Sequence, residues 1–370
     1  MEIKELTLHN FRNYGDESFL FDTRSNVIFG ENAQGKTNLL EAAVYLAKGE
    51  SPRAAADREL IRFDSAEAFL SARIQSRGRE FLTEIVLRRG LPRKISINGV
   101  GRKRGRDLAD ILSCVYFCPD DLFLIRAGAA ERRRFLNDAL RALLPRYEEA
   151  YRRYRSAWEQ KTRLLRLAEE KPSLLETLPA FNEQMERAGA LLIHYRARYT
   201  DALSRYADEI HRDCSGGRET LSVRYETVST VRDAHAPPEE IYLWLREHME
   251  AHAAAEAAAH VCLSGPHKDD LSIEVNGCTA RSFSSQGQAR TAALALKLAE
   301  REILAEAKEE YPILILDDVL SELDPRRQDF VLNRIRGGQV FLSCCEDDRL
   351  GELLSGSVFL IRDGRKEART

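Results

Sequence analysis

The stretch Gly30-Glu31-Asn32-Ala33-Gln34-Gly35-Lys36-Thr37 fits the phosphate-loop pattern G-x4-G-K-S/T, and it decides the fold that we expect. Glycines let backbone amides face phosphate groups, the lysine neutralises the β- and γ-phosphates, and the threonine hydroxyl is available to Mg²⁺. Residues 26–29, Asn-Val-Ile-Phe, precede the loop as a short buried strand, and residues 37–48 follow it with helical spacing. We therefore expect all eight residues to bind ATP.

A pair of acids follows a second buried strand. Residues 313–316 read Ile-Leu-Ile-Leu, and Asp317 and Asp318 come directly after them. A phosphate loop needs a carboxylate from a neighbouring strand to hold the metal ion. We expect Asp317 to bind Mg²⁺ together with Thr37, and Asp318 to polarise the attacking water, so Asp318 and Lys36 are the predicted catalytic residues.

The remaining pattern predicts an α/β protein. Alternating segments that are typical of antiparallel strands occur at 3–8, 17–21, 81–87 and 94–97. The last third of the chain alternates helices and apolar strands, at 288–307, 313–316, 326–336 and 339–343. Such alternation favours a mostly parallel sheet with helices on its faces.

The middle of the chain has a helical seam. Apolar residues recur three and four positions apart on both sides of a break bounded by Pro172 and Pro179, with Lys161 as the one interruption. The seam consists of Tyr147, Tyr151, Tyr154, Trp158, Leu165 and Ala168, then Phe181, Met185, Ala188, Leu192, Tyr195, Tyr199, Ala202 and Tyr206. We expect a helical hairpin, either a projecting coiled-coil arm or two helices of an ordinary bundle. The predicted division is an ATPase head at 1–144 and 261–370 with a helical lobe inserted at 145–260.

Two further motifs indicate a paired nucleotide site. Ser284-Ser285-Gln286-Gly287-Gln288 resembles the signature motif of ABC-type ATPases, with Ser285, Gly287 and Gln288 in the matching positions. A serine hydroxyl and free amides at a helix N-terminus form an anion site, which in such ATPases faces the γ-phosphate held by the partner subunit. The segment Ser321-Glu322-Leu323-Asp324 stands where the ABC D-loop would, with Ser321 and Asp324 as its site residues. We therefore expect ATP to bridge two copies of the chain.

Taken together, the sequence resembles the RecF family of SMC-like ABC-type ATPases over nearly its whole length. The resemblance rests on Asn10-Phe11-Arg12-Asn13-Tyr14 and on residues 37–42, 132–136, 265–271, 285–288, 291–300 and 317–324. It implies an ABC-type P-loop ATPase head with N-terminal antiparallel strands and an inserted, coiled-coil-like α-helical lobe. It also adds Arg12, Asn13 and Arg53 to the expected ATP site.

The resemblance further implies a function in DNA repair and replication. Members of this family are expected to dimerise with ATP on single-stranded, gapped or duplex DNA, and to help load recombinase at gaps together with RecO and RecR. The implied activity is a weak, DNA-dependent ATPase that uses ATP and Mg²⁺. Ser343-Cys344-Cys345 occupy the place of the ABC switch histidine, which favours slow turnover. Other departures from the family pattern are Pro52-Arg53-Ala54, Pro119-Asp120-Asp121 and Ala289.

Composition places limits on these expectations. A formal net charge of −3 over 370 residues gives no global basic field, so DNA must be bound by a local patch. No apolar run is long enough to cross a bilayer, and residues 1–5 lack the pattern of a secretory signal. The seven cysteines contain no C-x-x-C pair, which argues against a zinc site. We expect a reduced, cytoplasmic protein without a membrane partner.

One segment offers a candidate DNA patch. Residues 88–106 contain no acid and hold the basic side chains Arg88, Arg89, Arg93, Lys94, Arg102, Lys103, Arg104 and Arg106. These side chains either bind DNA phosphates or form the solvated rim of a hairpin.

Two other functions fit part of the pattern. The nucleotide-binding subunit of a membrane transporter carries the same ATPase motifs, but it needs a membrane partner. A structural SMC or zinc-hook head needs very long coiled coils and often a C-x-x-C hook, and the sequence has neither.

Overall fold

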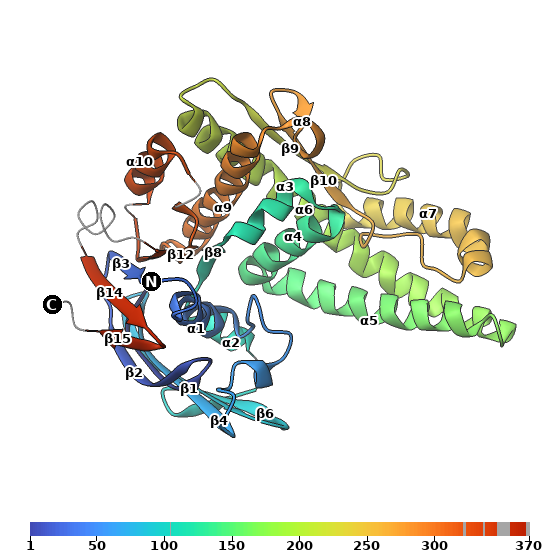
Figure 1. Cartoon of the computed structure of the whole chain (residues 1–370). Coiled ribbons are helices and arrows are strands. Elements are labelled where there is room, and N and C mark those ends of the chain that lie inside the picture. The colour runs from blue at the N-terminus through green and yellow to red at the C-terminus, as the bar shows by residue number, and fades with distance from the viewer. Residues whose placement is uncertain (104, 321–322, 336, 346–355, 368–370) are drawn as a thin grey trace. The chain divides into compact units, whose positions relative to one another are not determined.

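The computed structural model describes residues 1–370 except for 104, 321–322, 336, 346–355 and 368–370, and it describes only the backbone of Arg106. The chain forms two compact units. The first contains Met1–Asp121 and Lys297–Thr370, and the second contains Leu122–Leu296. Figure 1 shows the elements of both units along the chain.

An antiparallel sheet in the first unit has the strand order β2-β1-β4-β5-β6-β7. Its strands are β1 (Glu2–Phe11), β2 (Tyr14–Leu20), β4 (Glu67–Ser76), β5 (Arg79–Arg88), β6 (Leu91–Ile97) and β7 (Val100–Arg102). The pairing of β1 with β4 shifts register between Ile3 and Glu5, and this bulge lets Ile3, Leu6 and Leu8 all face the core. The predicted antiparallel strands near the N-terminus are confirmed.

A second sheet in this unit has the order β15-β14-β3-β13-β12-β8, in which only β15 runs antiparallel to its neighbour. The strands are β3 (Ser25–Phe29), β8 (Cys114–Phe117), β12 (Ile313–Asp317), β13 (Val340–Cys344), β14 (Gly356–Arg362) and β15 (Arg365–Glu367). Every residue of β12 and β13 is buried, as expected for parallel strands with both faces covered. The predicted parallel sheet is therefore confirmed.

Helix α1 (Lys36–Lys48) lies within the hydrophobic core of this unit. Every residue from Leu39 to Ala47 is buried, and the core cluster joins Leu6 of β1, Leu39 of α1 and Ile315 of β12. The shorter elements of the unit are the turn Asp57–Glu59 and the helices α2 (Arg106–Ala109) and α10 (Pro325–Arg334). The loop before α1 thus starts from a rigid strand and ends on a helix that the core immobilises.

The second unit is mainly helical. Its helices are α3 (Phe123–Arg126), α4 (Ala129–Leu143), α5 (Pro145–Leu167), α6 (Leu178–Ser215), α7 (Pro238–Ala259), α8 (Ala280–Phe283) and the first part of α9 (Gln286–Lys308). A short helical turn covers Pro172–Thr177, and another, Pro119–Leu122, begins in the first unit and ends with the first residue of the second. A small sheet has the order β11-β10-β9, with β9 (Leu221–Glu226), β10 (Asp270–Val275) and β11 (Cys278–Thr279). Helix α6 packs along both α5 and α7 (Figure 1). This is the predicted helical lobe.

The seam between the helices of the hairpin differs in one respect from the predicted seam. On α5 the buried residues include Ala150 and Ala157, whereas Tyr151 and Trp158 are only partly buried. Helix α6 packs against α5, α7 and β9, so it buries more than the single stripe of a coiled coil. Lys161, which interrupts the seam, is buried and forms an ion pair of 2.5 Å with Glu256 of α7. Packing by several elements therefore favours a bundle over a two-helix arm.

The compact units divide the chain differently from the predicted lobes. Both predicted boundaries, after residues 144 and 260, fall inside the second unit. Helix α4 precedes Pro145 in sequence but packs against α5, α6 and β10, and β10 pairs with β9. The change in sequence character at Pro145 marks the start of a helix rather than the edge of a compact unit.

Candidate nucleotide-binding site

The phosphate loop connects β3 to α1, and its glycines have conformations that other residues rarely adopt. Gly30 has φ +149°, and a Cβ there would lie 2.3 Å from the carbonyl oxygen of Ile361. Gly35 has φ +118°, and a Cβ there would lie 2.7 Å from the Asn13 side chain. Gly35 is also the N-cap residue of α1, so it offers no side chain that would compete for the first amides of the helix. The loop can therefore present backbone N–H groups to an anion.

Lys36 folds back over this loop. Its ammonium group donates hydrogen bonds to the carbonyl oxygens of Gly30 (2.5 Å) and Glu31 (2.9 Å), and the residue is 7% exposed. The thiol sulfur of Cys345 lies 3.7 Å from the same nitrogen and 3.0 Å from Oδ1 of Asn32. The only cation of the motif is thus held within the loop, where it can neutralise a phosphate.

The structure brings Thr37 and Asp317 together. The Thr37 hydroxyl donates a hydrogen bond of 3.1 Å to Oδ1 of Asp317, which also accepts one of 2.7 Å from Ser343. The Tyr116 hydroxyl donates to Oδ2 at 3.0 Å. Burial and the Asp317 carboxylate both raise the pKa of Tyr116, so this hydroxyl stays protonated and remains a donor. Three hydroxyls therefore orient one buried carboxylate.

Strand order explains this convergence. In the parallel ladder β13-β12-β8, Asp317 pairs with Ser343, and Ile315 pairs with Tyr116. Hydroxyl and carboxylate oxygens are ligands that Mg²⁺ prefers, so Thr37 and Asp317 fit a Mg²⁺ ion completed by phosphates and water. The described part of the chain contains no cluster of three His, Cys, Asp or Glu side chains that could hold a metal by itself.

Asp318 lies directly beside this carboxylate in an unusual backbone conformation. Its φ is +54°, and its N–H donates a hydrogen bond of 2.8 Å to the Ser343 hydroxyl. A non-glycine residue with positive φ costs free energy and is often found at functional sites. The Ser343 hydroxyl thus fixes both acids at once, because it donates to the first and accepts from the backbone of the second.

The three residues that the resemblance added lie around the loop and α1. Arg12 forms a two-pronged ion pair with the buried Glu41 of α1, at 2.8 and 2.7 Å. Asn13 donates to the carbonyl oxygen of Gln34 (3.0 Å) and accepts from Asn38 (2.8 Å). Arg53 donates to Oδ1 of Asn38 at 3.2 Å, and its side chain is 48% exposed. Arg12 is thus paired with Glu41 and Arg53 is half-exposed, and the binding of ATP by all three residues stays a prediction.

Some contacts of the loop have no counterpart in the sequence prediction. The buried Tyr14 hydroxyl donates to the carbonyl oxygen of Gly35 at 3.0 Å. The turn between β14 and β15 also contacts the loop, since the N–H groups of Asp363 and Gly364 donate to Gln34 at 2.7 and 2.9 Å. The sequence gives little indication that this turn contacts the phosphate loop, because only the pairing of β14 with β3 brings the two together.

The signature motif begins α9 in the second unit. The Ser285 hydroxyl accepts a hydrogen bond from the Gln288 N–H at 3.2 Å, and the Gln288 side chain accepts one from the Ser285 N–H at 2.9 Å. This reciprocal pair is a capping box, and it leaves Ser285 exposed at the helix N-terminus beside Gly287. Gln288 also donates to Glu219 at 2.9 Å.

Of the predicted D-loop residues, Ser321 lies outside the described residues. Asp324 caps α10, because its side chain accepts the Arg327 N–H at 3.1 Å and pairs with the Arg327 guanidinium at 2.7 Å.

The basic stretch 88–106 is partly used inside the first unit. Arg88 pairs with Glu67 at 2.8 Å, and Arg89 donates to three backbone carbonyl oxygens. Arg93 donates to Gly49 and to the Tyr45 hydroxyl and lies over the Tyr45 ring. Lys94, Arg102 and Lys103 are exposed, whereas Arg104 and the Arg106 side chain lie outside the described residues.

Comparison with known proteins identifies relatives of this chain. The sequence model of the RecF/RecN/SMC N-terminal domain matches residues 2–352. The DNA replication and repair protein RecF of Lachnoclostridium phytofermentans is 36% identical over 97% of this chain and 99% of its own. The protein of the same name from Gloeobacter violaceus is 37% identical over 91% of this chain and 89% of its own.

Solved structures of related proteins have the same fold. The recombination mediator protein RecF of the RecFOR pathway, in its ATP form, superimposes with a TM-score of 0.90 at 30% identity, covering 99% of this chain and 97% of that one. An Smc head domain from Pyrococcus furiosus superimposes with a TM-score of 0.57 at 17% identity, which shows a likeness of fold alone. The predicted fold class is confirmed. Among the described residues, no helix is long and apolar enough to cross a membrane.

Proposed function

The chain belongs to the RecF family of SMC-like ATPases, and from this premise we propose that it is an ATP-dependent DNA-binding recombination mediator. ATP joins two copies of the chain on DNA, and the dimer helps to load recombinase at gapped or single-stranded DNA together with RecO and RecR. The observation that carries the proposal is the hydrogen bond between Thr37 and Asp317, because it assembles the two halves of an ATPase site from distant parts of the sequence.

Each residue has a place in this mechanism. The loop amides and Lys36 bind the phosphates of ATP. Thr37 and Asp317 would hold Mg²⁺, which neutralises charge on the phosphates when bound. Asp318 accepts the proton of a water whose oxygen attacks the γ-phosphorus, and the bond from that phosphorus to the bridging oxygen of ADP breaks. The products are ADP and phosphate.

The second copy completes the site. Ser285 and the first amides of α9 are exposed at a helix N-terminus, where a γ-phosphate is favourably bound. In the proposed dimer they face the ATP held by the partner's loop. Hydrolysis removes the γ-phosphate that both copies contact, and it thereby releases the dimer from DNA.

Slow hydrolysis follows from the residue at the switch position. Ser343 already uses its hydroxyl to donate to Asp317 and to accept from the Asp318 N–H. It offers no imidazole that would contact the γ-phosphate in the transition state. ATP therefore acts mainly by holding the two copies together, and its slow hydrolysis releases the dimer from DNA.

DNA binding requires a cationic surface. Within the basic stretch, Lys94, Arg102 and Lys103 are exposed, and we include them as contacts to DNA phosphates. Arg88, Arg89 and Arg93 contribute less, because they are engaged in contacts within the first unit.

A binding titration tests the proposal. The affinity for fluorescently labelled gapped DNA is measured by anisotropy without nucleotide and with a non-hydrolysable ATP analogue and Mg²⁺. A dimer presents two DNA surfaces at once, so the analogue should raise the affinity by at least about tenfold. The Lys36→Ala variant is the matched control and should show no such gain. Equal affinity of the unsubstituted protein with and without the analogue would refute the proposed ATP-dependent dimerisation on DNA.

A further inference from the structure

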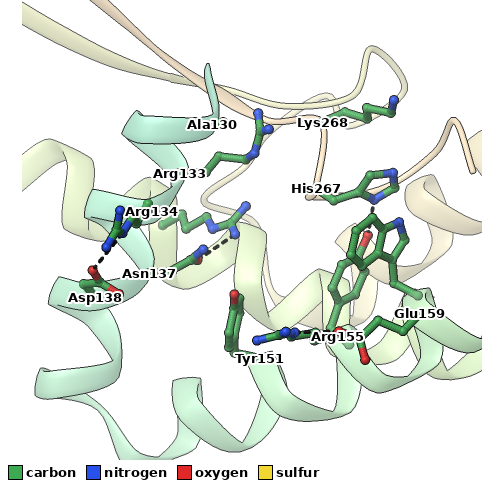
Figure 2. Close-up of a pocket in the computed structure, with 13 residues that line it drawn as sticks. Ala130, Arg133, Arg134, Asn137, Asp138, Tyr151, Arg155, Glu159, His267 and Lys268 are labelled. Atoms are coloured by element: carbon green, nitrogen blue, oxygen red, sulfur yellow. Dashed lines mark hydrogen bonds and ion pairs between the residues drawn. The ribbon is translucent and has the colours of Figure 1, made fainter. Parts of the chain in front are cut away.

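The second unit contains a cavity that the ATPase mechanism does not use. It has a volume of about 600 Å³, which lies in the range of small-molecule sites. Residues of α4, α5 and α6, together with His267 and Lys268, line it (Figure 2). All of its lining residues belong to the second unit, so its shape depends on that unit alone.

One wall of the cavity is aromatic. The rings of Trp158 and His267 lie 5.3 Å apart with an interplanar angle of 34°, and the Tyr154 ring lies 6.2 Å from His267. The Tyr154 hydroxyl donates to Nδ1 of His267 at 2.6 Å, while Nε2 donates to the Cys262 carbonyl oxygen at 3.3 Å. Gly265 permits this packing, since a Cβ there would lie 2.4 Å from the Tyr154 hydroxyl. The wall is thus rigid, and Trp158 remains partly exposed.

The charges around the cavity are not balanced. Arg134, Arg155 and Arg196 each pair with a carboxylate, respectively Asp138, Glu159 and Asp269. Within the described part of the chain, Arg133 and Lys268 form no ion pair. Arg133 is held by the backbone carbonyl oxygen of Asp269 at 2.7 Å, and Figure 2 shows both side chains on the same side of the cavity. Burial lowers the pKa of Arg133, and the neighbouring Arg196 lowers it further.

We propose that this cavity binds single-stranded DNA, with one base packed against Trp158 and His267 and the adjoining phosphates held by Arg133 and Lys268. The combination of an aromatic platform and unpaired cations is how proteins bind single strands without reading sequence. A duplex does not fit this description, because its bases are stacked on one another and cannot reach the wall. An acidic peptide would satisfy the two cations but would leave the aromatic wall unused. The inference deepens the proposed function and rests on its DNA binding.

The test uses the tryptophan of the wall as a reporter. The chain has two tryptophans, so Trp244→Phe leaves Trp158 as the only indole. In this variant of the whole chain, we expect oligothymidylate to quench the fluorescence of Trp158. The double variant Arg133→Ala/Lys268→Ala should bind about tenfold more weakly, and the slope of log K against log salt should shrink by about 1.4, or 0.7 for each lost contact. The matched control, Arg187→Ala/Arg212→Ala, removes two exposed arginines of α6 outside the cavity and should change neither quantity.

A second pair of variants separates stacking from folding. By anisotropy of labelled oligothymidylate, Trp158→Phe should keep most of the affinity, whereas Trp158→Ala should lose about tenfold. Unchanged quenching in the Arg133→Ala/Lys268→Ala variant would overturn the proposal. Equally strong quenching by polyglutamate would also overturn it, and would assign the cavity to an acidic protein segment.

The two proposals fail separately. Sedimentation of the same proteins with the ATP analogue and duplex DNA reports the ATP-dependent dimer without using the cavity. An ATP-dependent dimer without quenching of Trp158 would reject only the binding of DNA in the cavity. Quenching without an ATP-dependent dimer would reject only the proposed dimerisation on DNA.

Discussion

The Tyr116 hydroxyl is the least conspicuous of the three donors to Asp317, and its removal gives a sharp test of the metal site. Tyr116→Phe deletes one oxygen from a buried ring and leaves the packing of β8 intact. The lost hydrogen bond, 3.0 Å long, ends on a carboxylate. Asp317 keeps its hydrogen bonds from Thr37 and Ser343, so we expect the carboxylate to stay near its site but to lose its fixed orientation.

The magnitude follows from two independent estimates. A hydrogen bond to a charged group contributes about 1.5–3 kcal/mol net. Losing a residue that orients a metal ligand typically weakens metal binding by about 10–100-fold, which corresponds to about 1.4–2.7 kcal/mol. Both estimates predict that Tyr116→Phe weakens the binding of Mg²⁺·ATP by at least about tenfold.

The assay is a titration with a fluorescent ATP analogue, once with Mg²⁺ and once with EDTA. The loss should occur with Mg²⁺ and should vanish in EDTA, because the hydroxyl acts through the metal ligand. Tyr311→Phe is the matched control, since it removes a hydroxyl that contacts the carboxylate of Glu302 at 3.3 Å, outside the site. An equal loss in both buffers would show that Tyr116 supports only the fold. No loss in Mg²⁺ would refute the assignment of Asp317.

Three further predictions concern single residues. Lys36→Ala should weaken ATP binding about a thousandfold by calorimetry, because an ion pair near 4 Å contributes about 4 kcal/mol at a protein surface; detectable binding at similar affinity would contradict the role of this lysine. Asp318→Asn should lower the hydrolysis rate by about 10²–10⁴-fold while the ATP-bound dimer persists in sedimentation, and unchanged phosphate release would remove Asp318 from the base role. Burial lowers the pKa of His267 to about 4, below the value of about 6.5 in an unfolded chain. The contribution of neutral His267 to the free energy of unfolding should therefore be present above pH 6.5 and be lost as the pH falls toward 4. Between pH 7.5 and 5 we expect a loss of about 2 kcal/mol in urea unfolding that His267→Gln abolishes, and an equal decline in that variant would contradict this prediction.

The parts of the site that the sequence predicted are those encoded locally. The phosphate loop has fixed spacing, and Asp317 follows an apolar run whose burial is evident from composition alone. The sequence placed Ser343 at the switch position, but it did not predict that Ser343 and Tyr116 contact Asp317, because these segments meet only through the strand order β13-β12-β8. The same holds for the β14–β15 turn on the loop. Side-chain partners across parallel strands depend on the fold and not on sequence distance.

The helical lobe shows a different limit. A spacing of three and four residues predicted α5 and α6, but it could not choose between adjacent positions as the buried face. Alanines at 150 and 157 are buried, whereas Tyr151 and Trp158 are only partly buried, so the buried face of α5 is shifted by one position there. The rotation leaves Trp158 beside the cavity, where it is available to a ligand.

The central claim is that ATP joins two copies of this chain through Ser285. Sedimentation velocity with Mg²⁺ and saturating ATP analogue, on the unsubstituted protein and on Ser285→Arg, tests it directly. The unsubstituted protein should be a dimer, and Ser285→Arg should be a monomer that still binds ATP with unchanged affinity. A monomer of the unsubstituted protein at saturation, or a dimer of Ser285→Arg, would contradict it.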